Sequence, residues 1–433
     1  METKLERITQ LSKENPDMVF TSIGHFINMD MLKDCHVKMD KDKAVGIDGI
    51  TKEEYGLRLD ENLADLLDRM KKKSYHPKPA RRVEIPKDNG KTRPLSIYCY
   101  EDKLVQEALK RVLEAVFEPL FYNEMMGFRP NRGCHDALRL LNNQLVVQRT
   151  NWVLDADIKS FFDNIDHEWM MKFVGAKIRD PRILRLIKVM LKAGVVKDLS
   201  GYEETEQGSG QGSVCSPILS CIYMHYVLLW WFHEVVKSKL KGYAGIVNYA
   251  DDFVVCFQYK DDAELFYGLL KHRMAYFGLG LAEDKCRLIE FGRYAENNRK
   301  RRGEGKPETF DFLGFTHICS RTKSGKFGVR RKTSRKKFTK KCKDMHWKIG
   351  MMRTQKTADI IKWINQVLVG YYHYYGVIGN YDRVIGFRWN VLRSLFYWLN
   401  RRSQKKSYTW SGFYDMVDKG LPLVRPKSYY VYI

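Results

Sequence analysis

The sequence predicts an α+β fold in which helices cover an antiparallel sheet. Two segments, NWVLDADIKSFFDNI (151–165) and IVNYADDFVVCF (246–257), are rich in the β-branched and aromatic residues that favour strands. Amphipathic runs long enough for helices lie between them, which indicates helical connections between the strands. The 433 residues, 44% of them apolar, are sufficient for a substantial core and several subdomains.

Taken in order, the chain divides into five expected parts. Residues 1–75 carry apolar residues at helical spacing and form a predicted helical extension. Residues 76–320 contain a predicted β-hairpin with a basic tip at KDNGK, followed by the aspartate-bearing strands and several helices. A basic segment follows at 321–343. Helical periodicity with aromatic residues returns at 344–400, and residues 401–433 form a second basic segment.

Three helices and a further strand are predicted inside the central part. Asp166 would cap the helix that begins in DHEWMMKF, and Pro217 would lie in the first turn of a long buried helix. The run 262–279 has helical character, and FDFLGFTHI (310–318) is predicted to be a strand.

The positive charge of the chain is concentrated at one end. Lys and Arg number 75 against 52 Asp and Glu, for a net charge of +23. Residues 321–433 contain 26 Lys and Arg, five Asp and no Glu, so this part alone carries +21. A basic module beside a nearly neutral body indicates a polyanionic partner. The segment 321–343 could be a disordered basic arm or an ordered nucleic-acid-binding surface.

Composition argues against several protein classes. METKLERITQ has no apolar core, so we expect no secretory signal. The longest apolar patch, YMHYVLLWWF (223–232), is too short for a membrane span, which needs about 20 residues. The nine cysteines stand singly, without a C-x-x-C pair, which argues against a zinc ribbon or a disulfide framework and fits a reducing cytoplasm.

Aspartates interrupt both strand segments. DADIKSFFD (155–163) and YADD (249–252) place carboxylates in apolar strands, where burial is costly unless they are paired or bind a metal. The second pair alone would be read as a hairpin turn, since Asp is common in turns. Carboxylates from two neighbouring strands instead make an oxygen-rich site that suits Mg²⁺. Two such ions about 4 Å apart activate a hydroxyl and stabilise a leaving pyrophosphate, so the pattern predicts nucleotidyl transfer.

Eight motifs occur in a fixed order: RPLSIYCYEDKLVQEAL (93–109), GFRPNRGCHDAL (127–138), DADIKSFFDNIDH (155–167), GQGSVCSPILS (210–220), YADD (249–252), GLAEDK (280–285), FDFLGF (310–315) and LVGYYHYYGVIGN (368–380). This series resembles reverse transcriptases, and most closely the group II intron-encoded reverse transcriptase/maturase family. The resemblance implies a right-hand polymerase, with fingers and palm at 76–320 and a helical thumb, or maturase, domain at 344–400. Because paired cysteines are lacking, the chain is similar to the short class without a C-terminal endonuclease.

The resemblance also implies roles for the carboxylates. Asp157 and Asp251 match the metal ligands, and the backbone carbonyl of Ile158 would be a further ligand. Asp252 would be a third catalytic carboxylate that supports the site. Asp155 has no implied role, and we expect it, like Asp163, to cap a turn or to form a surface ion pair.

Residues around the predicted hairpin tip and the first carboxylate strand are implied in nucleotide binding. Lys87 and Arg93 would reach triphosphate oxygens, Lys as a point charge and Arg as a fork. Phe162 would occupy the space that a ribose 2′-hydroxyl needs and so select dNTPs. We expect Phe161 to lie in the core instead, because alternate strand residues point in opposite directions.

Two later motifs complete the implied nucleotide site. Gln211 would pack near the incoming nucleotide, and Gly212 would allow close backbone approach. Lys285 would protonate or neutralise the pyrophosphate.

The basic segment implies RNA contacts. The candidate residues are Arg330, Arg331, Lys332, Arg335, Lys336, Lys337, Lys340 and Lys341. The tyrosines of GYYHYYG (370–376) would either stack on bases or form a helical core patch.

The predicted function is that of an RNA-directed DNA polymerase that copies RNA into cDNA by two-metal nucleotidyl transfer with Mg²⁺. It would also bind its group II intron RNA to assist splicing and mobility. The alternative is a domesticated reverse transcriptase that serves DNA repair or phage defence without an intron. The expected partners are intron RNA, an RNA template with a DNA primer, target DNA and dNTPs, in a bacterial or archaeal cytoplasm and near the nucleoid when DNA is the target.

Overall fold

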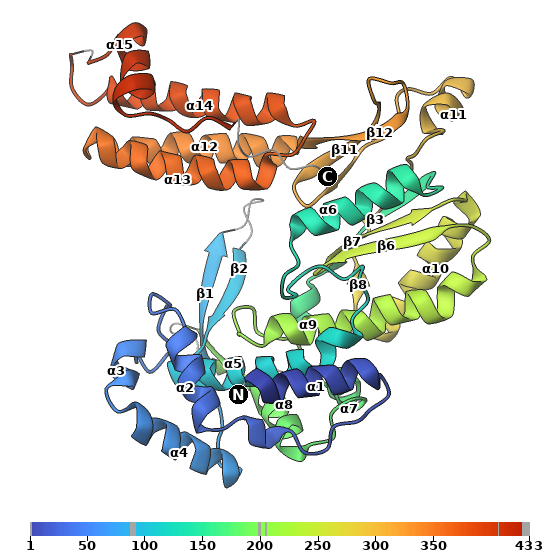
Figure 1. Ribbon diagram of the computed structural model, residues 1–433, viewed down its shortest axis with the longest axis vertical. Coiled ribbons are helices and arrows are strands. Elements are labelled where there is room, and N and C mark those ends of the chain that lie inside the picture. Colours follow the sequence, from blue (N-terminus) through green and yellow to red (C-terminus); the bar gives the residue numbers. More distant parts are fainter. Residues whose placement is uncertain (1, 87–91, 198–200, 204–205, 406, 427–433) are drawn as a thin grey trace.

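The computed structural model describes residues 2–86, 92–197, 201–203, 206–405 and 407–426. A helical N-terminal part, a central sheet covered by helices and a C-terminal helical bundle follow one another along the long axis of the molecule (Figure 1). The predicted α+β class, with antiparallel sheets covered by helices, is confirmed. None of the helices that the structure describes combines the length and the apolar character needed to cross a membrane.

The N-terminal part is helical, as its periodicity predicts. Its first two helices pack against the long helix α5, where they bury Leu32 and Leu104 in the main core. Thr51 begins the third helix with a capping box, in which its side chain and that of Glu54 each accept from the backbone amide of the other. The elements are α1 (Glu2–Glu14), α2 (Met29–Lys38), α3 (Lys52–Gly56), α4 (Leu59–Lys71) and α5 (Tyr100–Phe117).

A four-stranded sheet carries the predicted hairpin. β1 (Ala80–Pro86) and β2 (Thr92–Ile97) pair antiparallel from Arg81↔Ile97 to Pro86↔Thr92, as predicted. The other edge of β1 pairs in parallel with β4 (Val195–Lys197), which the sequence pattern did not indicate. β5 (Gly201–Glu203) completes the sheet in the order β2-β1-β4-β5.

The central sheet has five strands, and every pairing in it is antiparallel. Leu154, Ala156 and Ile158 face the main core beneath α9 and α10, whereas Val153 faces a second core beneath α6. Asp155 and Asp157 therefore lie on the α6 face, because strand residues alternate between faces. The strands are β3 (Trp152–Lys159), β6 (Ala244–Tyr249), β7 (Asp252–Phe257), β8 (Gly280–Leu281) and β9 (Arg287–Glu290).

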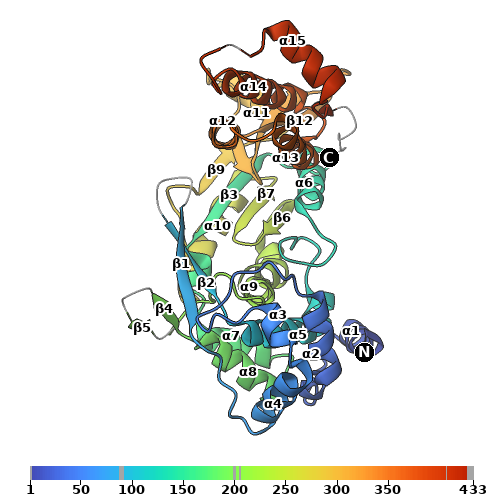
Figure 2. The same ribbon diagram turned by 90° about the vertical axis from the view of Figure 1, so that its left-hand side faces the viewer.

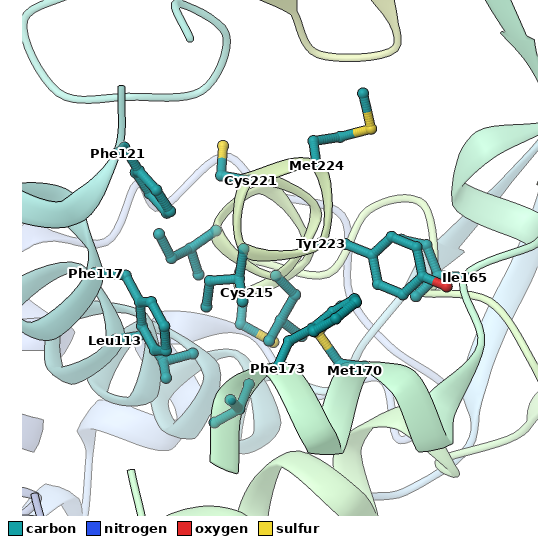
Figure 3. Close-up of a cluster of buried hydrophobic side chains, with 14 of the residues drawn as sticks. Leu113, Phe117, Phe121, Ile165, Met170, Phe173, Cys215, Cys221, Tyr223 and Met224 are labelled. Atoms are coloured by element: carbon teal, nitrogen blue, oxygen red, sulfur yellow. The ribbon is translucent and has the colours of Figure 1, made fainter. Parts of the chain in front are cut away.

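Two predicted helix starts in the central part are confirmed. Asp166 caps α7, with its carboxylate accepting from Trp169 N, and Pro217 lies in the first turn of α9. Phe117, Phe121 and Phe173 surround α9 in the main core, and α9 itself contributes Tyr223 (Figure 3). The helices are α6 (Cys134–Asn142), α7 (His167–Gly175), α8 (Pro181–Leu191), α9 (Ser216–Met224), α10 (Lys260–Tyr276) and α11 (Ala295–Arg301).

The C-terminal part joins a three-stranded sheet to a helical bundle. FDFLGFTHI, predicted as one strand, forms two, because Leu313 and Gly314 both take positive φ values and reverse the chain. The basic segment 321–343 is ordered, since it contains β12 and the first half of α12. The elements are β10 (Phe310–Phe312), β11 (Phe315–Arg321), β12 (Phe327–Thr333), α12 (Arg335–Met351), α13 (Thr357–Tyr375), α14 (Tyr381–Leu399) and α15 (Trp410–Asp415).

Candidate active site

The aspartates of YADD lie at the tip of the β6–β7 hairpin. Tyr249 pairs with Asp252, so Ala250 and Asp251 form a two-residue turn. Ala250 has a φ of 59°, a left-handed conformation that costs a residue with a Cβ about 1–2 kcal/mol. On the neighbouring ladder Asp252 pairs with Asp157 of β3. Because directly opposed residues point to the same face, the register brings carboxylates from two distant segments together.

A segment preceding α6 holds the hairpin tip in place. Met126 N donates to Asn248 O at 2.9 Å, and Asn248 N donates to Glu124 O at 2.9 Å. The Asn248 side chain then donates to Ala250 O at 2.8 Å. Gly127 packs directly against the turn, because a Cβ there would lie 2.4 Å from Ala250 N. These contacts hold Ala250 in its left-handed conformation and so fix the position of Asp251.

Burial and mutual repulsion perturb the carboxylates. Burial, followed by the charges of Asp251 and Asp157, raises the pKa of Asp252 to about 6. Burial and the charge of Asp157 also raise the pKa of Asp251, while the charges of Arg93 and Lys285 act in the opposite direction. Such a concentration of negative charge favours a bound cation.

Lys285 is the basic side chain that reaches the carboxylates. Its ammonium donates to Asp157 Oδ2, and this hydrogen bond raises the pKa of the lysine. Ala282 N donates to Asp157 O at 2.9 Å, and Lys285 N donates to Ala282 O at 2.8 Å, so the turn after β8 is anchored to β3. The backbone of GLAEDK therefore holds Lys285 beside Asp157.

The donor atoms at the candidate site fit a magnesium ion whose coordination shell the substrate would complete. Within the described ranges, no three His, Cys, Asp or Glu side chains form a ready metal cage. Magnesium in phosphoryl-transfer sites is held by one or two carboxylates together with waters and substrate phosphates. Asp157 and Asp251 are two carboxylates of that kind. Ile158 follows on β3 with its side chain in the main core, and the role of its carbonyl stays a prediction.

Phe162 and Gln211 line one cavity of about 1080 Å³. Phe161 is 1% exposed and belongs to the core, whereas Phe162 is only partly buried and meets the Phe128 ring edge-on at 6.1 Å. The expected division of roles between the two phenylalanines therefore agrees with their burial. Gln211 Nε2 donates to Asp163 Oδ1 at 3.3 Å, so Asp163 orients a cavity side chain.

The wall of this cavity depends on a glycine. Ser96 N of β2 donates to Gln211 O at 2.6 Å, which brings the two backbones into contact. Gly212 has a φ of 113°, and a Cβ there would lie 2.4 Å from Ser96 O, so the position requires glycine. Arg93 is exposed on β2, and its charge acts on the carboxylate site. Lys87 lies outside the described residues.

Asp155 lines a second cleft, of about 1010 Å³, between the central sheet and α12. It pairs with Arg287 of β9, and burial raises its pKa to about 7. We had expected a turn cap or a surface ion pair, but Asp155 is inside the β3 ladder on the same face as Asp157. Asp311 belongs to the FDFLGF motif, and Arg335, Lys336 and Lys340 belong to the predicted basic segment, but no motif indicated that they would share a cleft with Asp155. The other lining residues include Arg287, Thr309, Thr316 and Lys343.

The predicted RNA-contacting residues separate into exposed and buried positions. Arg335, Lys336, Lys337 and Lys340 are exposed on the first turns of α12, and Lys332 and Lys341 are partly exposed. Arg330 is exposed but forms an ion pair with Asp382. The prediction for Arg331 is wrong: it is 3% exposed and donates to Asn142 Oδ1, because it points into the molecule while Arg330 points out.

Comparison with known proteins is consistent with this geometry. Residues 85–317 match the family described as "Reverse transcriptase (RNA-dependent DNA polymerase)". The chain is 36% identical over 223 residues to "Group II intron-encoded protein LtrA" of Lactococcus lactis subsp. cremoris, covering 51% of this chain and 37% of that protein. It is 34% identical over 238 residues to "Protein YkfC" of Escherichia coli (strain K12), covering 48% and 62% respectively. The chain thus spans less than two thirds of the length of either relative.

Proposed function

Because the chain belongs to the reverse transcriptase (RNA-dependent DNA polymerase) family, we propose that it copies RNA into DNA and also binds a group II intron RNA to assist splicing and mobility. The observation that carries the polymerase part is the register Asp157↔Asp252, with Asp251 in the adjoining turn. The intron part rests on the similarity to an intron-encoded relative and on the basic face of α12.

The carboxylates would position the reacting groups. Asp157 and Asp251 would hold two magnesium ions, with Ile158 O as a further ligand and Asp252 as a supporting charge. When bound, the ions would lower the pKa of the primer 3′-hydroxyl and stabilise the charge on the leaving pyrophosphate. Lys285 donates a hydrogen bond to Asp157, which favours the charged ammonium form of the lysine. This ammonium would neutralise or protonate the departing pyrophosphate.

The cavity that Phe162 and Gln211 line would receive the incoming dNTP. Phe162 would exclude a ribose 2′-hydroxyl by occupying its space, because the ring is held edge-on by Phe128. Gln211, which also lines the cavity, would contact the nucleotide. Arg93, on β2, would bind the triphosphate, and so would Lys87, as its place in the sequence predicts.

The cleft between the central sheet and α12 would hold the RNA template and DNA primer, because it contains Asp155, two residues from Asp157 on the same face of β3, and is lined by basic side chains. Exposed cations on α12 would bind phosphates without sequence preference. Target DNA would bind the same surface. Because the protein would act on DNA, it would be located in the bacterial or archaeal cytoplasm, near the nucleoid. No feature of the site favours the alternative role in repair or phage defence.

Primer extension tests the proposal. Purified protein should extend a DNA primer on an RNA template with Mg²⁺ and dNTPs, and Asp251→Ala should abolish extension while leaving RNA binding largely intact. Asp261→Ala, an exposed aspartate on α10, is the matched control and should retain activity. Absence of extension by the unaltered protein would refute the polymerase role. Loss of RNA binding in Asp251→Ala would contradict the separation of the carboxylate site from the basic surface.

A further inference from the structure

The tyrosines of GYYHYYG are not available for stacking on bases. Tyr371 and Tyr372 are 5% and 0% exposed, and both belong to the core of the helical bundle. Tyr374 is partly buried, with its hydroxyl donating to Leu313 O at 2.8 Å. Of the two possibilities left open by the sequence, the core patch is therefore correct. Exposed aromatic side chains of this part of the chain lie elsewhere, at Trp347 on α12 and on α14 and α15.

Two tryptophans and a phenylalanine form a stack on the outer side of α14 and α15. The rings of Phe396 and Trp410 are 3.8 Å apart and inclined by 14°, and those of Trp410 and Trp389 are 6.3 Å apart and also inclined by 14°. Trp389 is 46% exposed and Trp410 is 40% exposed. The stack is thus anchored in the bundle at Phe396 and open to solvent at Trp389. Large aromatic faces left in water next to polar groups are characteristic of interaction sites.

The stretch of chain that carries the stack is rich in basic residues. Residues 381–425 contain nine Lys and Arg against three Asp. Each of these aspartates already has a basic partner, in Arg330, Lys419 or Arg425. Arg393 is exposed one helical turn after Trp389, on the same stripe of α14. Arg393 therefore places a positive charge beside the exposed end of the stack.

This surface is separate from the candidate active site. α15 lies at the outer end of the helical bundle, and the bundle helices lie between it and the central sheet (Figures 1 and 2). Among the described residues, those that line the Asp155 cleft from the bundle all belong to α12. A ligand on the α14–α15 stack would therefore leave the cleft accessible to a template and primer.

We propose that the Trp389–Trp410 stack is a second nucleic-acid-binding surface, which takes an unpaired stretch of RNA by stacking a base on Trp389 while Arg393 contacts its phosphates. This inference rests on the proposed function, since it gives the RNA partner a contact outside the polymerase cleft. A flat exposed indole matches the face of any base, and an adjacent guanidinium matches a phosphate. Duplex RNA would bind weakly there because its base faces are occupied by neighbouring base pairs.

The test measures binding of fluorescein-labelled 12-mer oligouridine while excess unlabelled RNA–DNA duplex occupies the cleft. Trp389→Ala should weaken oligouridine binding about tenfold, the loss expected for one base stack. Trp389→Phe should retain part of the affinity, because a smaller ring still stacks. Arg393→Gln should lower the salt dependence of binding by about 0.7 in log–log slope, the value for one phosphate on a single strand. Primer extension by these variants should be unchanged on a short template.

Trp230→Ala is the matched control, because Trp230 is 41% exposed but lies on the helix that continues α9. Trp410 is left unaltered because it packs on Phe396 and Phe413, so that its removal could unfold the bundle. Equal weakening by Trp230→Ala and Trp389→Ala, or unchanged oligouridine binding in Trp389→Ala, would overturn the proposal. The proposal would also be overturned if the protein bound no oligouridine and Trp389→Ala converted an oligomer to a monomer, because the stack would then be a protein–protein interface. Failure of primer extension with intact oligouridine binding would instead refute the polymerase role alone.

Discussion

Gly127→Ala should slow nucleotide incorporation without touching any carboxylate. The added Cβ would lie 2.4 Å from Ala250 N and 3.0 Å from the carbonyl carbon of Tyr249. Ordinary contact needs about 3.5 Å, so the hairpin tip must move by roughly 1 Å. Both neighbouring atoms belong to the backbone, and no side chain can rotate away to relieve the overlap.

A displacement of that size at Asp251 has a large kinetic effect. Misplacing a reacting group by about 1 Å can reduce the rate about 100-fold. Single-turnover incorporation of one dNTP on a saturating primer–template measures this step directly. The expected result is a fall of roughly two orders of magnitude in the incorporation rate, with nucleic-acid affinity close to that of the unaltered protein.

Gly268→Ala is the control for this experiment. Gly268 lies within α10, and a Cβ there would meet nothing within 4 Å. Removing a helix glycine should stabilise the protein by about 0.5–1 kcal/mol and leave the rate unchanged. An unaltered incorporation rate in Gly127→Ala would show that the tip moves freely and that its contact with Gly127 does not place Asp251.

Three further outcomes are expected. Phe162→Ala should admit ribonucleotides, measured as the ratio of kcat/KM for dNTP and NTP, and an unchanged ratio would remove Phe162 as the gate. Burial raises the pKa of Asp102 from its usual 3.8 to about 6, so the folded state binds a proton more tightly than the unfolded state. The free energy of unfolding should therefore fall by up to about 3 kcal/mol as the pH rises from 4 to 6. Asp102→Asn should remove that pH dependence in thermal unfolding, and an identical slope in both proteins would contradict the assignment. Lys336→Gln should lower the salt dependence of RNA binding by about one phosphate contact, whereas Arg331→Gln should lower the unfolding temperature and leave the salt dependence unaltered.

Local patterns predicted the elements of the site well. YADD forms a hairpin tip because its apolar flanks pair as β6 and β7, and the strand before Asp157 pairs with β7. Phe161 and Phe162 also differ in burial as expected, but they lie in the short helical turn Phe161–Asp163 after β3, so strand alternation is not the reason. The hairpin predictions succeeded because strand periodicity and turn chemistry are properties of neighbouring residues.

The predictions that failed depend on contacts between segments that lie far apart in the sequence. Arg330 and Arg331 are both basic, and only the packing of β12 against α6 decides that Arg331 is buried. FDFLGF became two strands because Leu313 adopts positive φ, which a β pattern does not anticipate for leucine. Asp155 and Arg287 meet through the register of β3 with β9, which depends on the whole sheet.

Main-chain hydrogen bonds hold the carboxylate-bearing segments in position. Asp157 O accepts from Ala282 N, and Asn248 O accepts from Met126 N. Such bonds exist whatever side chain stands at each position, provided that the residue is not proline. If Phe162 and Gln211 select the nucleotide as proposed, a library that varies them would therefore explore new nucleotide preferences while the carboxylates keep their positions. We expect that substrate choice and chemical competence would then vary independently, starting from the cavity that these two residues line.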